Sequence, residues 1–202
     1  MKFIRKSSED EMIATFLLAE LESKRFKGKI LDYLSKKSID KTIITNPDLR
    51  NNKQNIIRKN ILKVYRGYGR NSLLFENFPS QLKWEWISLS ESDIRKIKYI
   101  NYSYWVKLSN NTRLAKNALE NIRKGVKIFN QGNRIFLEAS KILYLGKAFP
   151  PLILVSAKKG TDIVVLEGHL RLTTYLLNPK LIPPKIKAII GYSGEIEKWN
   201  YY

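Results

Sequence analysis

Apolar residues recur at intervals of three and four along much of the chain, which is the spacing of one helix face. The pattern predicts helices over residues 12–21, 30–34, 56–66, 114–126 and 134–145. Ser8 and Glu11 have the spacing of a capping box before the first of these helices, and we expect Gly28 to break it. The third helix is expected to turn four residues to the core: Ile57, Ile61, Val64 and Tyr65.

Other stretches predict turns and strands. Residues 45–55 are rich in Asn and Asp and are predicted to form a loop, and Ser90 to Asp93 have the pattern of a helix start. Alternating apolar residues predict one short strand near 82–88. In the last third, a helix, two buried strands, a helix and a third strand follow one another, and the strands carry the sequences PPLILV, DIVVLE and KIKAIIGYS.

This order of elements predicts an α+β protein in which the C-terminal part is built on a small mixed β-sheet. We expect residues 1–110 to be mainly helical and basic, and residues 111–202 to hold the sheet, with a weak boundary near 106–111. The two regions could also pack as one unit. No segment is long and apolar enough to predict a membrane span or a secretory signal, so we expect a cytoplasmic protein.

The composition limits the kinds of functional site that the chain can contain. The chain has no cysteine and one histidine, which excludes disulfides, thiol nucleophiles and a histidine-rich metal cluster. Its formal net charge is +19, with 22 basic and 12 acidic residues in 1–110 and 15 and 6 in 111–202. Such an excess favours an anionic partner, nucleotide or nucleic acid. Lysine greatly outnumbers arginine, so A/T-rich codons are an alternative source of part of the charge.

The strongest local motif is Glu167-Gly168-His169-Leu170-Arg171, where a predicted strand turns into a helix. The N–H groups at a helix start and the helix dipole attract anions. Gly168 permits close approach of a ligand, Arg171 can bind two phosphate oxygens, and His169 can donate a hydrogen bond or carry a proton. Glu167 can bind Mg²⁺ or act as a base. The alternative is a tight turn with no ligand.

With the upstream FPPLILV strand, the VVLEGHxR motif resembles the ParB/sulfiredoxin-like superfamily, over about residues 134–192. The nearest subtype carries an aspartate-glycine-histidine-threonine-arginine signature and includes free-serine kinases. The resemblance implies a phosphate site for ATP, CTP or a diphosphate at Gly168, His169 and Arg171, with Glu167 at the acidic position and Mg²⁺ as a possible ion. It predicts an NTP hydrolase or a phosphotransferase.

Departures from the family limit this prediction. The catalytic cysteine of sulfiredoxins is absent, and the arginine pair of partition proteins is replaced by Leu170-Arg171. The kinases use a catalytic glutamate outside the motif, for which Glu138 is the candidate, although a solvated helix residue is the simpler interpretation. Ser193 follows the last strand and is expected to line the same pocket, because loops at sheet ends often do.

A second hypothesis is a non-enzymatic DNA- or RNA-binding protein of a bacterial defence or DNA-modification system. Residues 50–70 contain no acid, and Lys59, Lys63 and Arg66 form a stripe on the predicted helix. The candidate nucleic-acid contacts are Arg50, Lys59, Lys63, Arg66 and Arg70. A solvated helix face explains the stripe nearly as well.

An aromatic group could take part in the same function. Its members could stack on bases, or simply pack in a core: Tyr99, Tyr102, Tyr104 and Trp105. A third hypothesis is a protein-binding module with a vestigial motif.

Overall fold

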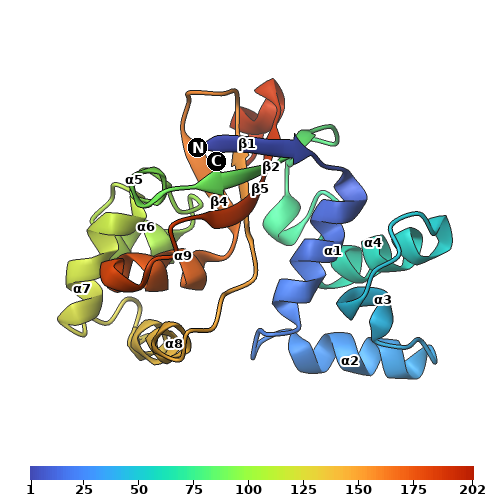
Figure 1. The fold of residues 1–202 in the computed structure, drawn as a ribbon, viewed down its shortest axis with the longest axis horizontal. Coiled ribbons are helices and arrows are strands. Elements are labelled where there is room, and N and C mark those ends of the chain that lie inside the picture. Colours follow the sequence, from blue (N-terminus) through green and yellow to red (C-terminus); the bar gives the residue numbers. More distant parts are fainter.

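The fold is built around a sheet whose central strands are apolar on both faces. The computed structural model describes residues 1–202 and contains one five-stranded sheet in the order β1–β2–β5–β3–β4 (Figure 1). Strands β5 and β3 are parallel and the other neighbours are antiparallel. The class predicted from the sequence, α+β with a mixed sheet, is therefore confirmed. The strands are β1 (Lys2–Lys6), β2 (Lys83–Leu89), β3 (Leu152–Ser156), β4 (Ile163–Glu167) and β5 (Ile186–Tyr192).

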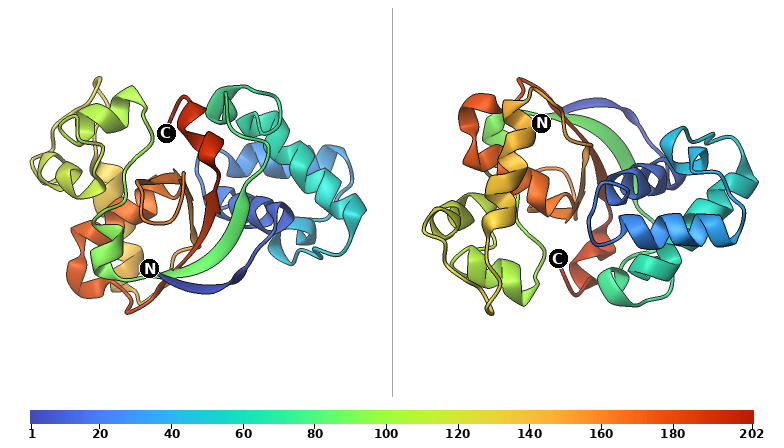
Figure 2. Two further views of the ribbon diagram at one scale, coloured as in Figure 1. Left: turned by 90° about the horizontal axis from the view of Figure 1, so that it is seen from above. Right: turned by 90° about the horizontal axis from the view of Figure 1, so that it is seen from below.

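Helices cover both faces of this sheet, as the views from above and below show (Figure 2). One set precedes β2 and consists of α1 (Glu9–Glu20), α2 (Lys27–Lys36), α3 (Thr42–Thr45) and α4 (Asn52–Arg66). The other set consists of α5 (Glu91–Ile94), α6 (Ser103–Leu108), α7 (Leu119–Arg123), α8 (Arg134–Tyr144) and α9 (His169–Leu177). Short 3₁₀ turns are η1 (Leu73–Phe75), η2 (Ala115–Ala118), η3 (Pro179–Leu181) and η4 (Gly194–Lys198). None of the helices combines the length and apolarity that a membrane crossing requires.

The two helix sets pack into two separate hydrophobic cores. In β3, Ile153 and Val155 face the core of α1–α4, whereas Leu152 and Leu154 face the core of α6–α9. Successive side chains of a strand point to opposite faces, so a continuous apolar run fits a strand that is buried on both sides. This arrangement explains why the strands of the last third are so clear in the sequence.

The structure confirms the predicted order of the last third and the strand near 82–88. Strand β1 was not predicted, because all five of its residues are exposed at the sheet edge and carry no buried alternation. Strands β1 and β2 come from residues 1–110, whereas β3 to β5 come from 111–202. The two regions therefore share one sheet and pack as one unit.

Several helix boundaries differ from the predicted ones. Helix α1 ends at Glu20, and Gly28 lies inside α2. Helix α4 begins inside the predicted loop 45–55, because the Asn51 side chain accepts a hydrogen bond from the backbone N–H of Gln54 and caps the helix. The predicted 114–126 helix is divided between η2 and α7.

The core-facing side of α4 also differs from the predicted one. Val64 is exposed, whereas Leu62 and Arg58 are fully buried. The Arg58 guanidinium donates hydrogen bonds of 2.9 Å to the carbonyl oxygens of Ile43 and Asp48, and another to the Asn55 side chain. Arg58, which belongs to the basic stretch 50–70, therefore holds α4 against the residues in and after α3.

We predict that Arg58→Ala destabilises the protein by roughly 3 kcal/mol, because two buried carbonyl oxygens lose their donor and a cavity remains. The matched control is Lys53→Ala, which removes an exposed cation from the same helix and should cost less than about 0.5 kcal/mol. Urea unfolding followed by circular dichroism measures both. Equal, small losses would show that Arg58 does not support the fold.

Candidate functional site

The predicted strand–turn–helix arrangement of the Glu167–Arg171 motif is present. Strand β4 ends at Glu167, Gly168 is the N-cap of α9 with φ +107°, and α9 begins at His169. The backbone N–H groups of His169, Leu170 and Arg171 donate no hydrogen bond within the protein. They are therefore free for an anion at the positive end of the helix dipole.

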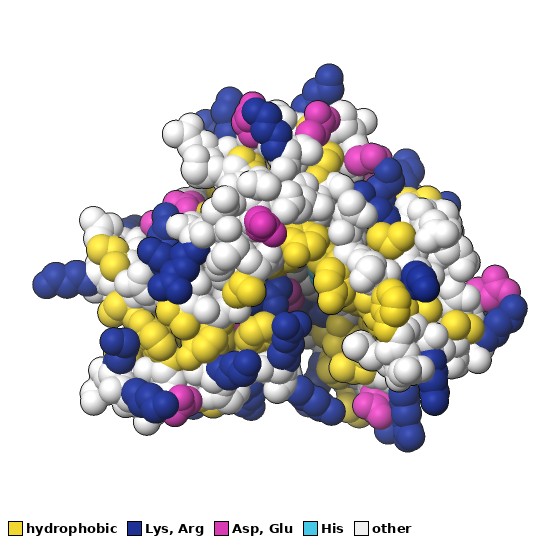
Figure 3. Space-filling model, turned by 180° about the vertical axis from the view of Figure 1, so that it is seen from behind, with side chains coloured by type: hydrophobic (Ala, Val, Ile, Leu, Met, Phe, Trp, Pro, Cys, Tyr) yellow, Lys and Arg dark blue, Asp and Glu magenta, His cyan; other side chains and the backbone are white.

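A cavity of about 410 Å³ lies beside this helix start. Residues from both halves of the chain line it, and seen from behind the molecule is hollowed between the two helix sets, with Lys and Arg side chains along the edges (Figure 3). Its wall is mostly aromatic or aliphatic, and it is large enough for one nucleotide-sized ligand. The lining residues are Arg25, Phe26, Tyr65, Arg66, Leu73, Leu74, Ile100, Tyr102, Trp105, His169 and Tyr201.

Two arginines supply unused donors to this cavity. The guanidinium carbons of Arg25 and Arg66 lie 4.9 and 4.8 Å from the centre of the Phe26 ring. Arg25 makes no ion pair, and the only carboxylate paired with Arg66 is Glu20, with 3.5 Å between Nε and Oε1. The Arg66 Nε is enclosed and donates no hydrogen bond. Buried polar groups are normally hydrogen-bonded, so this arginine lacks an acceptor that a ligand can supply.

His169 reaches the cavity as a neutral imidazole. Its ring stacks on Trp105 at a centroid distance of 4.8 Å and on Tyr99 at 6.0 Å. The enclosed Nε2 has no hydrogen-bond partner. Burial, followed by the charges of Arg66 and Arg171, lowers the pKa of His169 to about 3. The side chain is therefore fitted for hydrogen bonding to a ligand, and not for carrying a proton at neutral pH.

Glu167 and Arg171 lie behind the cavity wall. The Arg171 Nη2 donates to the Pro151 carbonyl oxygen at 3.2 Å, and Nη1 lies 3.5 Å from Glu167 Oε1. The Arg171 side chain also lies against Gly168, where an added Cβ would be 2.9 Å from Nη2. In this structure, Arg171 thus supports the β4–α9 turn, and neither it nor Glu167 lines the cavity.

Glu20, which the sequence did not single out, is the buried carboxylate beside the cavity. It is 4% exposed, and its Oε1 accepts no hydrogen bond. Burial, followed by repulsion from Glu167, raises the pKa of Glu20 to about 7, although Arg66, Arg171 and Arg25 oppose the shift. Glu20 is the last residue of α1, most of which is buried, and only the tertiary structure shows that it meets Arg66.

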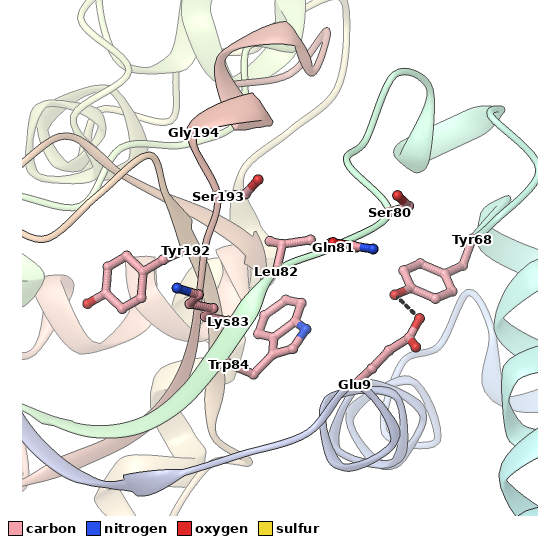
Figure 4. Close-up of a pocket in the computed structure, with 10 residues that line it drawn as sticks. All are labelled: Glu9, Tyr68, Ser80, Gln81, Leu82, Lys83, Trp84, Tyr192, Ser193 and Gly194. Carbon is pink, nitrogen blue, oxygen red and sulfur yellow. Dashed lines mark hydrogen bonds between the residues drawn. The ribbon is translucent and has the colours of Figure 1, made fainter.

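Two predicted site residues lie elsewhere. Glu138 is half-exposed on α8, pairs with Arg134 at 3.3 Å and does not line the cavity. Ser193 caps η4, where its Oγ accepts from the Glu195 N–H, and it lines a second cavity of about 540 Å³. Figure 4 shows this second cavity, with Ser193 near Leu82 and the hydrogen bond from Tyr68 to Glu9 at its far side.

The five basic residues that were predicted to contact nucleic acid have different surroundings in the structure. Lys59 pairs with Glu9 at 2.9 Å, and Lys63 is only partly exposed. Arg66 turns inward to line the cavity, whereas Arg50 and Arg70 are exposed on other segments. The stripe therefore does not form one continuous exposed row.

The aromatic group also divides between a core and the cavity. Tyr99 is fully buried and forms a hydrogen bond with Thr173, and Tyr104 donates to Asn133. Tyr102 and Trp105 line the cavity, where they can stack on a planar ligand.

No group of three or more His, Cys, Asp or Glu side chains is placed to hold a metal ion. Glu167 of the motif and the buried Glu20 each face an arginine. Mg²⁺ commonly binds through one or two carboxylates together with substrate phosphates and water. Glu167 can serve such a site only together with oxygen atoms that a ligand brings.

Comparisons of the chain with protein-family models, with curated proteins and with solved structures found no match.

We predict that Gly168→Ala destabilises the protein by about 2–4 kcal/mol. At φ +107° an added Cβ would lie 2.6 Å from the Leu152 side chain as well as against Arg171. Gly160→Ala is the matched control, because Gly160 has φ +87° but nothing within 4 Å of the added Cβ. It should cost only about 1 kcal/mol for the backbone conformation. Equal losses in urea unfolding would contradict the close packing around Gly168.

Proposed function

We propose that this protein binds a nucleoside phosphate in the cavity between its two helix sets. The observation that carries the proposal is a largely apolar cavity lined by Arg66, whose Nε donates no hydrogen bond, and by His169, whose Nε2 has no partner and whose backbone N–H is free at the start of α9. Charge-assisted bonds from arginine and N–H groups at a helix start are the usual means of holding phosphate. The resemblance of the motif to ParB/sulfiredoxin-like nucleotide binders supports the same ligand class.

The positions of the cationic and the aromatic side chains in the cavity suggest how the ligand lies. The phosphates occupy the side of the cavity with Arg25, Arg66 and the N–H groups of α9. The base takes the apolar side, where Tyr102 and Trp105 offer ring faces and stacking stabilises a base by about 1–3 kcal/mol. ATP, CTP and the corresponding diphosphates all fit this division.

We further propose that the bound nucleotide is hydrolysed, or transfers its terminal phosphate, with Glu20 as the base. Glu20 lies behind the cavity wall and does not line it, so one intervening water carries to ionised Glu20 the proton of the attacking water or acceptor hydroxyl, while that oxygen forms a bond to the terminal phosphorus. The bond from phosphorus to the bridging oxygen breaks, and the leaving phosphate keeps the electron pair. Arg66 stabilises the charge on the phosphate oxygens. A pKa of about 7 for Glu20 suits a base at neutral pH.

A thermal-shift assay with nucleoside di- and triphosphates, with and without Mg²⁺, tests the binding step. At a ligand concentration 100 times Kd, we expect about 2.7 kcal/mol of stabilisation, which corresponds to a rise in Tm of about 5–10 °C. Arg66→Ala should remove most of this rise, because it deletes the enclosed cation of the cavity. Arg70→Ala removes an exposed cation outside the cavity and should leave the rise unchanged.

A folded protein whose Tm responds to no nucleotide would refute the proposal and favour the protein-binding alternative. A rise that survives in Arg66→Ala would place the nucleotide somewhere else. If binding occurs without phosphate release or transfer, the catalytic part of the proposal fails and the binding part stands.

Glu20 also gives a prediction about pH that does not depend on ligand. Folded Glu20 keeps its proton up to a pKa of about 7, whereas the unfolded chain loses it near the ordinary value of about 4.3. Between these values the folded state binds more protons, so the free energy of unfolding falls as pH rises.

Glu20→Gln removes this dependence. We expect the variant to gain about 1–3 kcal/mol relative to the parent protein between pH 5 and pH 8. His169 changes stability with pH in the opposite direction, but it is present in both proteins, so its contribution cancels in the difference. Urea unfolding at several pH values measures the effect, and parallel curves would contradict the raised pKa of Glu20.

A further inference from the structure

A basic segment stands at the mouth of the cavity. Residues 24–29, with the sequence KRFKGK, span the end of the link between α1 and α2 and the first turn of α2, and carry four cations and no acid. Lys24, Lys27 and Lys29 are exposed and make no ion pair. The second and third residues of this segment, Arg25 and Phe26, line the cavity itself. The three lysines therefore extend the cationic surface of the cavity outward along the chain.

The position of these lysines is unfavourable for the helix that they begin. Helix α2 has no acidic residue in its first turn and no side-chain cap, and it starts with Lys27. Cations at a helix N-terminus oppose the helix dipole, typically by a few tenths of a kcal/mol to about 1 kcal/mol each. Local stability does not account for this arrangement, whereas an anionic partner that neutralises the lysines does.

The cavity alone already provides for the phosphates of one nucleotide, through Arg25, Arg66 and the start of α9. The lysines outside it would face solvent beyond such a ligand. We infer that the nucleoside phosphate bound here is the phosphorylated end of a single-stranded nucleic acid, whose following phosphates lie along Lys24, Lys27 and Lys29. This inference rests on the proposed function, because it uses the same cavity for the terminal nucleotide.

The size and lining of the cavity determine the form of this ligand. A volume of about 410 Å³ matches one nucleotide, and the unstacked base that such a cavity takes is found at single-stranded ends, so the inference concerns an unpaired end. The terminal base stacks on the aromatic side, and the lysines contact only the backbone. Recognition is therefore weakly dependent on sequence, as in other sites that combine stacking with a basic groove.

The test measures binding of short fluorescent oligonucleotides by anisotropy over a range of salt concentrations. The probes carry a 5′-phosphate, a 3′-phosphate or no terminal phosphate, and ATP and inorganic polyphosphate serve as competitors. The variant Lys24→Ala/Lys27→Ala/Lys29→Ala removes the basic segment. The matched control Lys180→Ala/Lys185→Ala/Lys187→Ala removes the same charge from exposed positions beyond the other end of α9.

We expect a phosphorylated strand to bind at least ten times more tightly than its unphosphorylated form, and ATP to displace it. In the Lys24/Lys27/Lys29 variant, the slope of log affinity against log salt should decrease in magnitude by about 2, since each lost contact to a single strand contributes about 0.7. ATP binding should change less than threefold, and the control variant should retain the parental slope.

The outcomes separate this inference from the proposed function. If ATP binds in the cavity but phosphorylated strands bind no more tightly than unphosphorylated ones, the inference is wrong and the proposed function stands. If polyphosphate displaces the strand as well as ATP does in an Arg66-dependent manner, the ligand is a phosphate chain and not a nucleic acid. If neither ATP nor any strand binds, both proposals fail. Equal slopes for the two triple variants would also overturn the inference.

Discussion

The burial of both faces of the central strands is the constraint on which this structure depends. Strands β3 and β5 are apolar along both faces and cannot leave either face to water, so helices must cover each side. The N-terminal helices cover one face and the later helices the other. His169, which follows the β4–α9 turn, lines the cavity together with residues of both helix sets. The site is thus a consequence of the layering, and it needs residues from both halves of the chain.

Electrostatics around the cavity are arranged in two layers. The wall presents Arg25 and Arg66, and behind it Glu20 and Glu167 partly balance Arg66 and Arg171. Burial, followed by the charges of Arg66 and Arg171, holds His169 neutral. The same burial holds a proton on Glu20 near neutral pH. An anionic ligand would neutralise the cations of the wall, so its binding should shift the pKa of both groups upward, and protonation of this site and occupation by ligand are coupled.

The sequence predicts β2 to β5, α9 and the strand-to-helix turn at Gly168 because these features depend on neighbours in the chain. Strand β1 escapes prediction because an exposed edge strand needs no apolar alternation. Glu20 escapes it as part of the site for a different reason, because only the packing of α1 against the rest of the chain brings it to Arg66. The sequence proposes Trp105 only as one of four aromatic residues for stacking, and the fold is needed to place it against His169. Ser193 and Glu138 are the opposite case. The sequence proposes both for the site, but both lie outside the cavity in the folded chain.

The chain divides its positive charge between two residue types with different physical roles. None of its 26 lysines is buried. The inward-facing cations are arginines: Arg58 and Arg113 bind carbonyl oxygens, Arg171 supports the β4–α9 turn, and Arg66 lines the cavity with a Nε that donates no hydrogen bond. The guanidinium is more weakly hydrated than the ammonium and offers five donors in a fixed plane, so it is less costly to bury and better satisfied by several oxygen atoms. Helix α4 shows the division directly, since Arg58 and Arg66 turn inward while Lys59 stays in solvent. The net charge of +19 therefore has two components. Several arginines bind groups in the interior or line the cavity, whereas the lysines create the long-range field that attracts an anion to the cavity.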